Sequence, residues 1–194
     1  SDDGNWLLTL GATPVLWNLA NGARPAKAVN FPENEGPVWS AAFSHDGRWL
    51  ITGGSSDSTV KANVWDLAAG NLDEASYLLG NQLRRDTGAI SVSPDNKWVV
   101  AGEGYQYYCD YCTVSAWKLS ATGPDPGSEV RLGEHKGPIR EILFTSDSKA
   151  AITASEDGTV RIWNLDHPDG SNHPIVLNAA RDPVNSIALS ADDR

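Results

Sequence analysis

The chain has 194 residues, of which 40% are hydrophobic and 21% are charged, a composition typical of a globular protein. Its 25 acidic and 15 basic residues give a net charge of −10, which would repel a phosphate backbone, so we expect no nucleic-acid partner. It has no run of 18 or more apolar residues, so we expect no membrane span. The sequence contains no Met, from which we expect a piece of a longer chain, and it leaves the compartment open.

Strand-like segments follow one another along the whole chain, which we treat as a single repeat-built unit over 1–194. The expected repeats cover approximately 1–31, 32–80, 81–133 and 134–178, with a final strand at 183–189. The first repeat has three strand-like segments, at about 5–11, 14–19 and 26–31, and each of the next three repeats has four.

The fourth repeat shows the pattern most clearly. PIREILF (138–144) alternates between apolar and polar residues, whereas AAITAS (150–155) is almost continuously apolar and predicts a strand buried on both faces. TVRIWNL (159–165) alternates again, and PIVL (174–177) is short. The turn residues TSDS (145–148) separate the first two of these segments. Equivalent segments, SHDGRW and SPDNKW, occur in the two preceding repeats and predict hairpin turns, since they lack the ligand series of a calcium loop.

Four tryptophans mark the same place in each repeat, in the segments VLWNLA, NVWDLA, SAWKLS and RIWNLD. Trp17, Trp65, Trp117 and Trp163 are spaced 48, 52 and 46 residues apart. A period of 40–50 residues that ends in such a strand is the sequence form of one propeller blade.

These features resemble the WD-repeat β-propeller family over essentially the whole chain. The family's dipeptide is present literally at Trp65-Asp66, its Gly-His element as Gly133-Glu134-His135, and its turn aspartate at Asp57 and Asp157. The resemblance implies an all-β fold in which four-stranded antiparallel blades form a β-propeller, with four degenerate repeats in this chain as a fragment or a half-ring.

Closure of the ring is a second implication of the resemblance. Members of the family exchange a terminal strand, so segment 183–189 is expected to complete the first blade, either within the chain or from a second chain. A four-blade ring turns about 90° per blade and an eight-blade ring about 45°. Because WD-type repeats suit the gentler turn, we expect a homodimer that forms an eight-blade ring, with half of a longer propeller as the competing interpretation.

A structural network is expected where the family has buried hydrogen bonds. Its candidate members here are His135, Ser155, Asp157 and Trp163, with Asp57 and Trp65 in the second repeat. Ser, His and Asp together also invite a catalytic interpretation, but a triad needs an accessible nucleophile and an oxyanion site. We therefore expect no catalytic residues.

The two cysteines, Cys109 and Cys112, lie in the segment CDYC. A structural zinc site generally needs four ligands, and no nearby Cys or His completes one, so neither a metal site nor a cofactor is expected. A local disulfide and a pair of free thiols remain open alternatives.

The insertion from Glu103 to Cys112 stands between the second and third strands of the third repeat, where the other repeats have short turns. It holds four of the five tyrosines, namely Tyr105, Tyr107, Tyr108 and Tyr111. These side chains either pack back on the blade or form a protruding aromatic surface that binds a partner. Family geometry places the insertion near Asn34, His135 and Arg181.

The function implied by the resemblance is a non-catalytic scaffold for protein–protein interaction. The acidic residues beside the tyrosines favour a protein or peptide partner with Lys or Arg. A carbohydrate or small-ligand receptor that uses the Tyr-rich hairpin is one alternative. A propeller enzyme with an active site at the channel mouth is another.

Overall fold

A computed structural model describes residues 1–11, 13–20, 27–30, 37–54, 61–69, 72, 76–79, 86–104, 109–168, 173–179, 182–190 and 193, with the backbone alone at 27–30 and 61. Fifteen strands occur in these ranges. They form four sheets, and every strand pair within them is antiparallel.

The strands follow chain order within each sheet. The first sheet contains β1 (Trp6–Thr9), β2 (Val15–Asn18) and β3 (Lys27–Asn30). The second contains β4 (Val38–Phe43), β5 (Trp49–Gly54), β6 (Lys61–Asp66) and β7 (Ser76–Leu79). The third contains β8 (Thr87–Val92), β9 (Trp98–Glu103), β10 (Cys112–Ser120) and β11 (Gly123–His135). The fourth contains β12 (Ile139–Phe144), β13 (Ala150–Ser155), β14 (Thr159–Asn164) and β15 (Ile175–Asn178).

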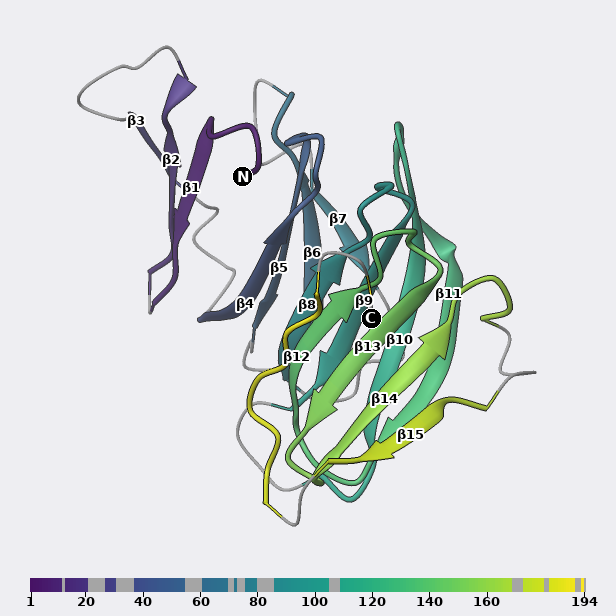
Figure 1. The fold of residues 1–194 in the computed structure, drawn as a ribbon. Coiled ribbons are helices and arrows are strands. Elements are labelled where there is room, and N and C mark those ends of the chain that lie inside the picture. The colour runs from purple at the N-terminus through teal and green to yellow at the C-terminus, as the bar shows by residue number, and fades with distance from the viewer. Residues whose placement is uncertain are drawn as a thin grey trace.

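The four sheets stand face to face as successive blades (Figure 1). Strand β8 contacts β4 on one side and β12 on the other, so the first strands of neighbouring sheets lie together on the inner side of the stack. The expected all-β fold of antiparallel blades is confirmed, with three four-stranded sheets and one three-stranded sheet among the described strands.

Apolar side chains fill the spaces between successive sheets, and the second strands are the most deeply buried. In β13, every residue after Ala150 is buried, as the continuous apolar run AAITAS predicted. One core cluster joins the second and third sheets through Trp49 and Trp117, and another joins the third and fourth through Val114 and Trp163. A smaller cluster around Leu16 joins the first two sheets.

Hairpin turns after the first strands repeat one geometry, which confirms their interpretation as turns. The fourth residue of the turn takes a positive φ at Gly47, Asn96 and Ser148, and its N–H donates to the first residue's carbonyl at 2.9 Å. The turns of neighbouring sheets also bond to each other. His45 N donates to Asn96 Oδ1 at 2.7 Å, and Asp95 N donates to Ser148 Oγ at 3.0 Å.

The strand predicted at 183–189 is wrong for this chain. Residues 182–190 form no strand and lie against the fourth sheet, where Val184 N donates to Ser155 O at 3.1 Å and Ile187 N donates to Glu141 Oε2 at 2.6 Å. The first sheet, which this strand was expected to complete, stands at the opposite end of the stack (Figure 1). A strand needs a neighbour to pair with, and within one chain the two intervening sheets keep these partners apart.

The turn that follows this segment nevertheless matches the other three. Asp193 has a φ of 56°, and its N–H donates to Ser190 O at 2.9 Å. Its carboxylate accepts a hydrogen bond from Ser146 N at 2.9 Å, so the turn contacts the preceding one as in the sheets before it. Residues 182–190 and Asp193 therefore lie where the first strand and turn of a following sheet belong.

Candidate functional site

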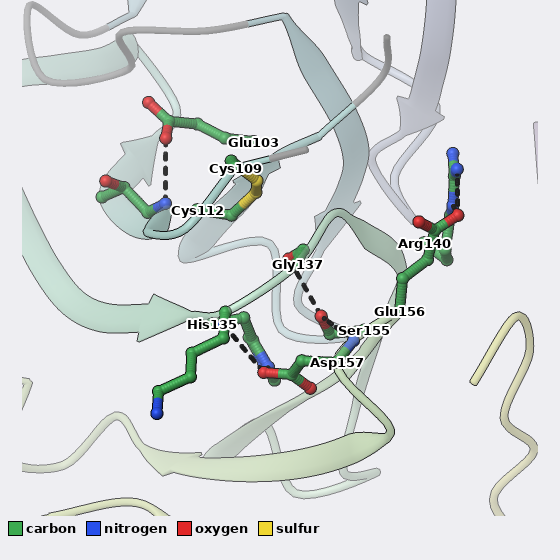
Figure 2. Close-up of a disulfide and its surroundings, with 11 residues drawn as sticks. Glu103, Cys109, Cys112, His135, Gly137, Arg140, Ser155, Glu156 and Asp157 are labelled. Carbon is green, nitrogen blue, oxygen red and sulfur yellow. Dashed lines mark hydrogen bonds and ion pairs between the residues drawn. A yellow bond between two sulfur atoms is a disulfide. The ribbon is translucent and has the colours of Figure 1, made fainter. Parts of the chain in front are cut away.

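The His135–Asp157 pair lies where β11 ends and where β13 turns into β14 (Figure 2). Asp157 Oδ2 accepts a hydrogen bond from Lys136 N at 2.8 Å and contacts His135 Nδ1 at 3.1 Å. Its Oδ1 accepts from Thr159 N at 2.9 Å and from Thr159 Oγ1 at 2.6 Å. One carboxylate thus ties the end of the third sheet to the turn of the fourth.

A relay of hydrogen bonds leads from the imidazole into the core. His135 Nε2 lies 2.7 Å from Thr153 Oγ1, which also accepts a hydrogen bond from Trp163 Nε1 at 2.9 Å. In a neutral imidazole, Nδ1 donates to Asp157 and Nε2 accepts from the threonine hydroxyl, so that each group of this relay has a hydrogen-bond partner. The sequence analysis did not name Thr153 or Thr159, although both stand in the repeated segments around the turn.

Burial sets the protonation state of this pair. Burial lowers the pKa of His135 to about 4, against the attraction of the Asp157 carboxylate, which raises that pKa. Burial would raise the pKa of Asp157, but hydrogen bonds from Thr159 and Lys136 outweigh it and hold the pKa at about 2. At neutral pH the pair is therefore a neutral imidazole beside a carboxylate.

Ser155 does not take the place of a nucleophile beside this histidine. Its Oγ donates to Gly137 O at 2.9 Å (Figure 2) and accepts from Asp157 N at 3.1 Å. His135 Nε2 instead lies 2.7 Å from Thr153 Oγ1. Ser155 and His135 are both buried. The hydroxyl, imidazole and carboxylate are all engaged in fixing the turn, so the triad geometry of acyl transfer is not formed by these residues.

The second sheet repeats part of this arrangement. Trp65 is fully buried, and its Nε1 donates to Thr52 Oγ1 at 2.9 Å, as Trp163 donates to Thr153. Asp57, the predicted turn aspartate of this repeat, lies outside the described residues.

The third sheet departs from the arrangement. Ala101 stands at the register position of Thr153, and neither Trp117 Nε1 nor Ser115 Oγ has a hydrogen-bond partner among the described residues. In place of a turn aspartate, the carboxylate of Glu103 accepts the N–H of Thr113 at 2.9 Å. Thr113 and Thr159 both stand four residues before their sheet's tryptophan. The sequence analysis did not assign Glu103 this role. The signal that could have indicated it is a carboxylate directly after the apolar run WVVAG.

Cys109 and Cys112 form a disulfide, which decides between the local disulfide and the free thiols that the sequence left open. Both side chains belong to the core cluster between the third and fourth sheets. Cys112 pairs with His135 in the β10–β11 ladder, so the last residue of the insertion lies beside His135, while Asn34 and Arg181 lie outside the described residues. Tyr111 is exposed, whereas Tyr105, Tyr107 and Tyr108 lie outside the described residues.

No group of three or more His, Cys, Asp or Glu side chains suited to a metal ion occurs among the residues placed by the structure. In the same residues, no helix has the length and apolar character that crossing a membrane would require.

Comparison with known proteins agrees with this geometry. The family described as "WD domain, G-beta repeat" matches residues 27–62 and 128–164, the second of which includes His135, Asp157 and Trp163. Two segments of this chain thus match the WD40 repeat model. The first match covers β3 to β6 in part, and the second runs from β11 to the end of β14.

Several curated relatives align with most of the chain. The "Protein LST8 homolog" of Drosophila melanogaster is 27% identical over 85% of this chain and 50% of its own length. The "Target of rapamycin complex subunit wat1" of Schizosaccharomyces pombe is 26% identical over 99% of this chain and 57% of its own length. The "SIR4-interacting protein SIF2" of Saccharomyces cerevisiae is 26% identical over the whole chain and 35% of its own length. The chain thus spans about half the length of these relatives, or less.

Proposed function

We propose that the protein is a non-catalytic scaffold that binds a protein or peptide partner through loops at one end of its blades. The observation that supports this most directly is the engagement of His135, Asp157 and Ser155 in buried structural hydrogen bonds, which leaves this cluster no free nucleophile or base. Relatives named as a target of rapamycin complex subunit and as an interacting protein support a role within protein assemblies.

The partner-binding surface in this proposal is the Tyr-rich connection with Tyr105, Tyr107, Tyr108 and Tyr111. Tyrosine provides a large contact area at low cost in conformational entropy. Asp110 is exposed beside Tyr111, and the chain as a whole carries a charge of −10, so a partner segment with Lys or Arg fits this surface.

A peptide array tests this function. The chain would be applied to dodecapeptides with and without one Lys or Arg among apolar residues, and to a glycan array in parallel. Replacing the four tyrosines by Ser should weaken peptide binding by 2 kcal/mol or more (order of magnitude) and leave the melting temperature nearly unchanged. Binding confined to the glycans would instead favour a carbohydrate receptor. A large loss of melting temperature with peptide binding intact would make the insertion a packing element.

We also propose that two copies of the chain associate into an eight-blade ring. Residues 182–190 and Asp193 dock on the fourth sheet like the first strand and turn of a further blade, and the described part of the first sheet has no strand in that position. Leu7 on the first sheet, and Ile175 and Leu177 on the fourth, are exposed apolar side chains that this association would cover. Light scattering at low micromolar concentration should give the mass of a dimer. A stable, well-folded monomer would refute the ring.

A further inference from the structure

A four-residue disulfide ring closes the connection between β9 and β10. Cys109 and Cys112 are 1% and 0% exposed, and their Cα atoms are 5.5 Å apart. The two residues between them point the other way, because Asp110 is exposed and the side chain of Tyr111 is 66% exposed. The ring therefore presents one carboxylate and one phenol above two buried sulfur atoms.

The base of this ring is anchored on both sides. Glu103 is 1% exposed, and its Oε2 accepts the N–H of Thr113 directly after the ring (Figure 2). Cys112 is held in the ladder opposite His135, and the disulfide packs in a cluster that includes Val114 and Ile139. The ring is thus fixed to the core and does not rely on the residues at its tip.

Because the ring is closed and anchored, Asp110 and Tyr111 would lose less conformational entropy on binding a partner. A side chain on a closed, anchored ring has fewer conformations than one on an open loop, so more of its contact energy appears as affinity. The third sheet also lacks the hydrogen-bond relay of the fourth, since Ala101 stands in the position of Thr153. Besides the β-ladders, the disulfide and the hydrogen bond from Thr113 to Glu103 hold this end of the third sheet.

We propose that Asp110 and Tyr111 form a preorganised docking tip for a single Lys or Arg side chain of a partner peptide, and that the Cys109–Cys112 disulfide is required for its affinity. The carboxylate pairs with the cation, and the phenol ring packs against the aliphatic stem or the cation itself. This inference rests on the proposed function, since it assigns the tyrosine-rich surface its contact residues and its partner chemistry.

The shape of the tip can be tested without any partner. Chymotrypsin needs an extended substrate, which the closed ring cannot adopt around Tyr111. The variant C109A/C112A keeps both sites apolar and opens the ring, so cleavage of the Tyr111–Cys112 bond in the native chain should be about tenfold slower than cleavage of the equivalent bond in the variant. Retained protection of the buried bond after Trp163 would show by mass spectrometry that the variant is folded. Equal cleavage of the two proteins would overturn the preorganised tip.

Binding is then measured with the best Lys or Arg dodecapeptide from the array. D110N and C109A/C112A should each raise its Kd about fivefold or more. The matched control D166N removes one exposed carboxylate in the connection between β14 and β15, at the opposite end of the blades, and should leave the Kd unchanged. An unchanged Kd in C109A/C112A would overturn the role of the disulfide even if the array confirms docking. If no Lys or Arg peptide binds the native chain, the docking tip is refuted together with the basic partner of the proposed function.

Discussion

At the scale of single residues, Asp157 is the acceptor on which the end of the fourth blade depends. Its oxygens serve the backbone N–H groups of Lys136 and Thr159, the Thr159 hydroxyl and the His135 ring. Asp157→Ala leaves the donors of this partly buried turn without their acceptor, so we expect the free energy of unfolding to fall by about 1–3 kcal/mol in urea denaturation. Asp166→Ala, at an exposed turn, should change it by less than about 0.5 kcal/mol. Equal losses in the two variants would contradict the assignment.

Trp163 fills the space between the third and fourth blades. Trp163→Ala should lower the free energy of unfolding by about 3–5 kcal/mol, because it leaves a cavity and removes the hydrogen bond to Thr153. Trp17 is the matched residue of the first blade and is only half-buried, so Trp17→Ala should cost clearly less. Thermal denaturation of both variants measures the difference, and a larger loss from Trp17→Ala would be inconsistent with this packing.

The buried imidazole makes stability depend on pH. The pKa of His135 is about 4 in the folded chain and about 6.5 when unfolded, so between these values the unfolded state binds more protons. Stability is therefore full above pH 6.5 and falls as the pH drops toward 4, by about 2–3 kcal/mol from this group. Urea midpoints at pH 7 and pH 4.5 should show the loss. An NMR titration that finds His135 protonated at pH 6 would disprove it.

At the scale of elements, the hairpin turns link neighbouring blades through Asn96. This residue has a φ of 58°, and its side-chain oxygen accepts the N–H of His45 at 2.7 Å. Asn96→Ala should lower the free energy of unfolding by about 1–2 kcal/mol, since it removes the bond and leaves a β-carbon in the left-handed region. Asn96→Gly also removes the hydrogen bond, but glycine adopts a positive φ without strain. This variant should therefore lower the free energy of unfolding by less. If both variants have the same melting temperature, the backbone at this turn is not under strain.

Sequence periodicity predicted individual strands correctly where the whole strand lies in one kind of surroundings, either buried or half-exposed. AAITAS predicted a strand buried on both faces, and β13 is buried accordingly, although the third blade is its only neighbour among the described sheets. Segment 183–189 also contains apolar residues, but it forms no strand and runs beside the fourth sheet without a ladder. Periodicity indicates which side chains are buried, whereas the pairing of a strand depends on which sheet edge lies next to it.

At the scale of the whole molecule, residues 182–190 are held to the fourth blade by few polar contacts. Ile187 N donates to Glu141 Oε2 at 2.6 Å, and Val184 N donates to Ser155 O. Glu141→Ala should therefore increase the hydrogen-exchange rate of amides in 182–190 by about three- to tenfold, while amides of β13 keep their protection. Glu141→Gln retains an acceptor and should have a smaller effect. Unchanged exchange in Glu141→Ala would show that the segment is held by other contacts.

The sequence by itself determined the blade architecture, because a repeat near 50 residues places a tryptophan at the matching position of each unit and a hairpin turn at the matching position of three units. It also indicated that His135, Asp157 and Trp163 belong together, since their spacing recurs in a family whose blades use them. These properties depend on residues that lie close in sequence or repeat at a fixed period.

Only the tertiary structure decided how each blade satisfies its buried groups. Thr153 links His135 to Trp163, and Glu103 replaces a turn aspartate from a neighbouring strand, because cross-strand register brings these side chains together. The disulfide was one of two alternatives until the fold placed both cysteines in one core cluster. The position of residues 182–193 on the fourth blade depends on the stacking of whole sheets, which no local pattern contains.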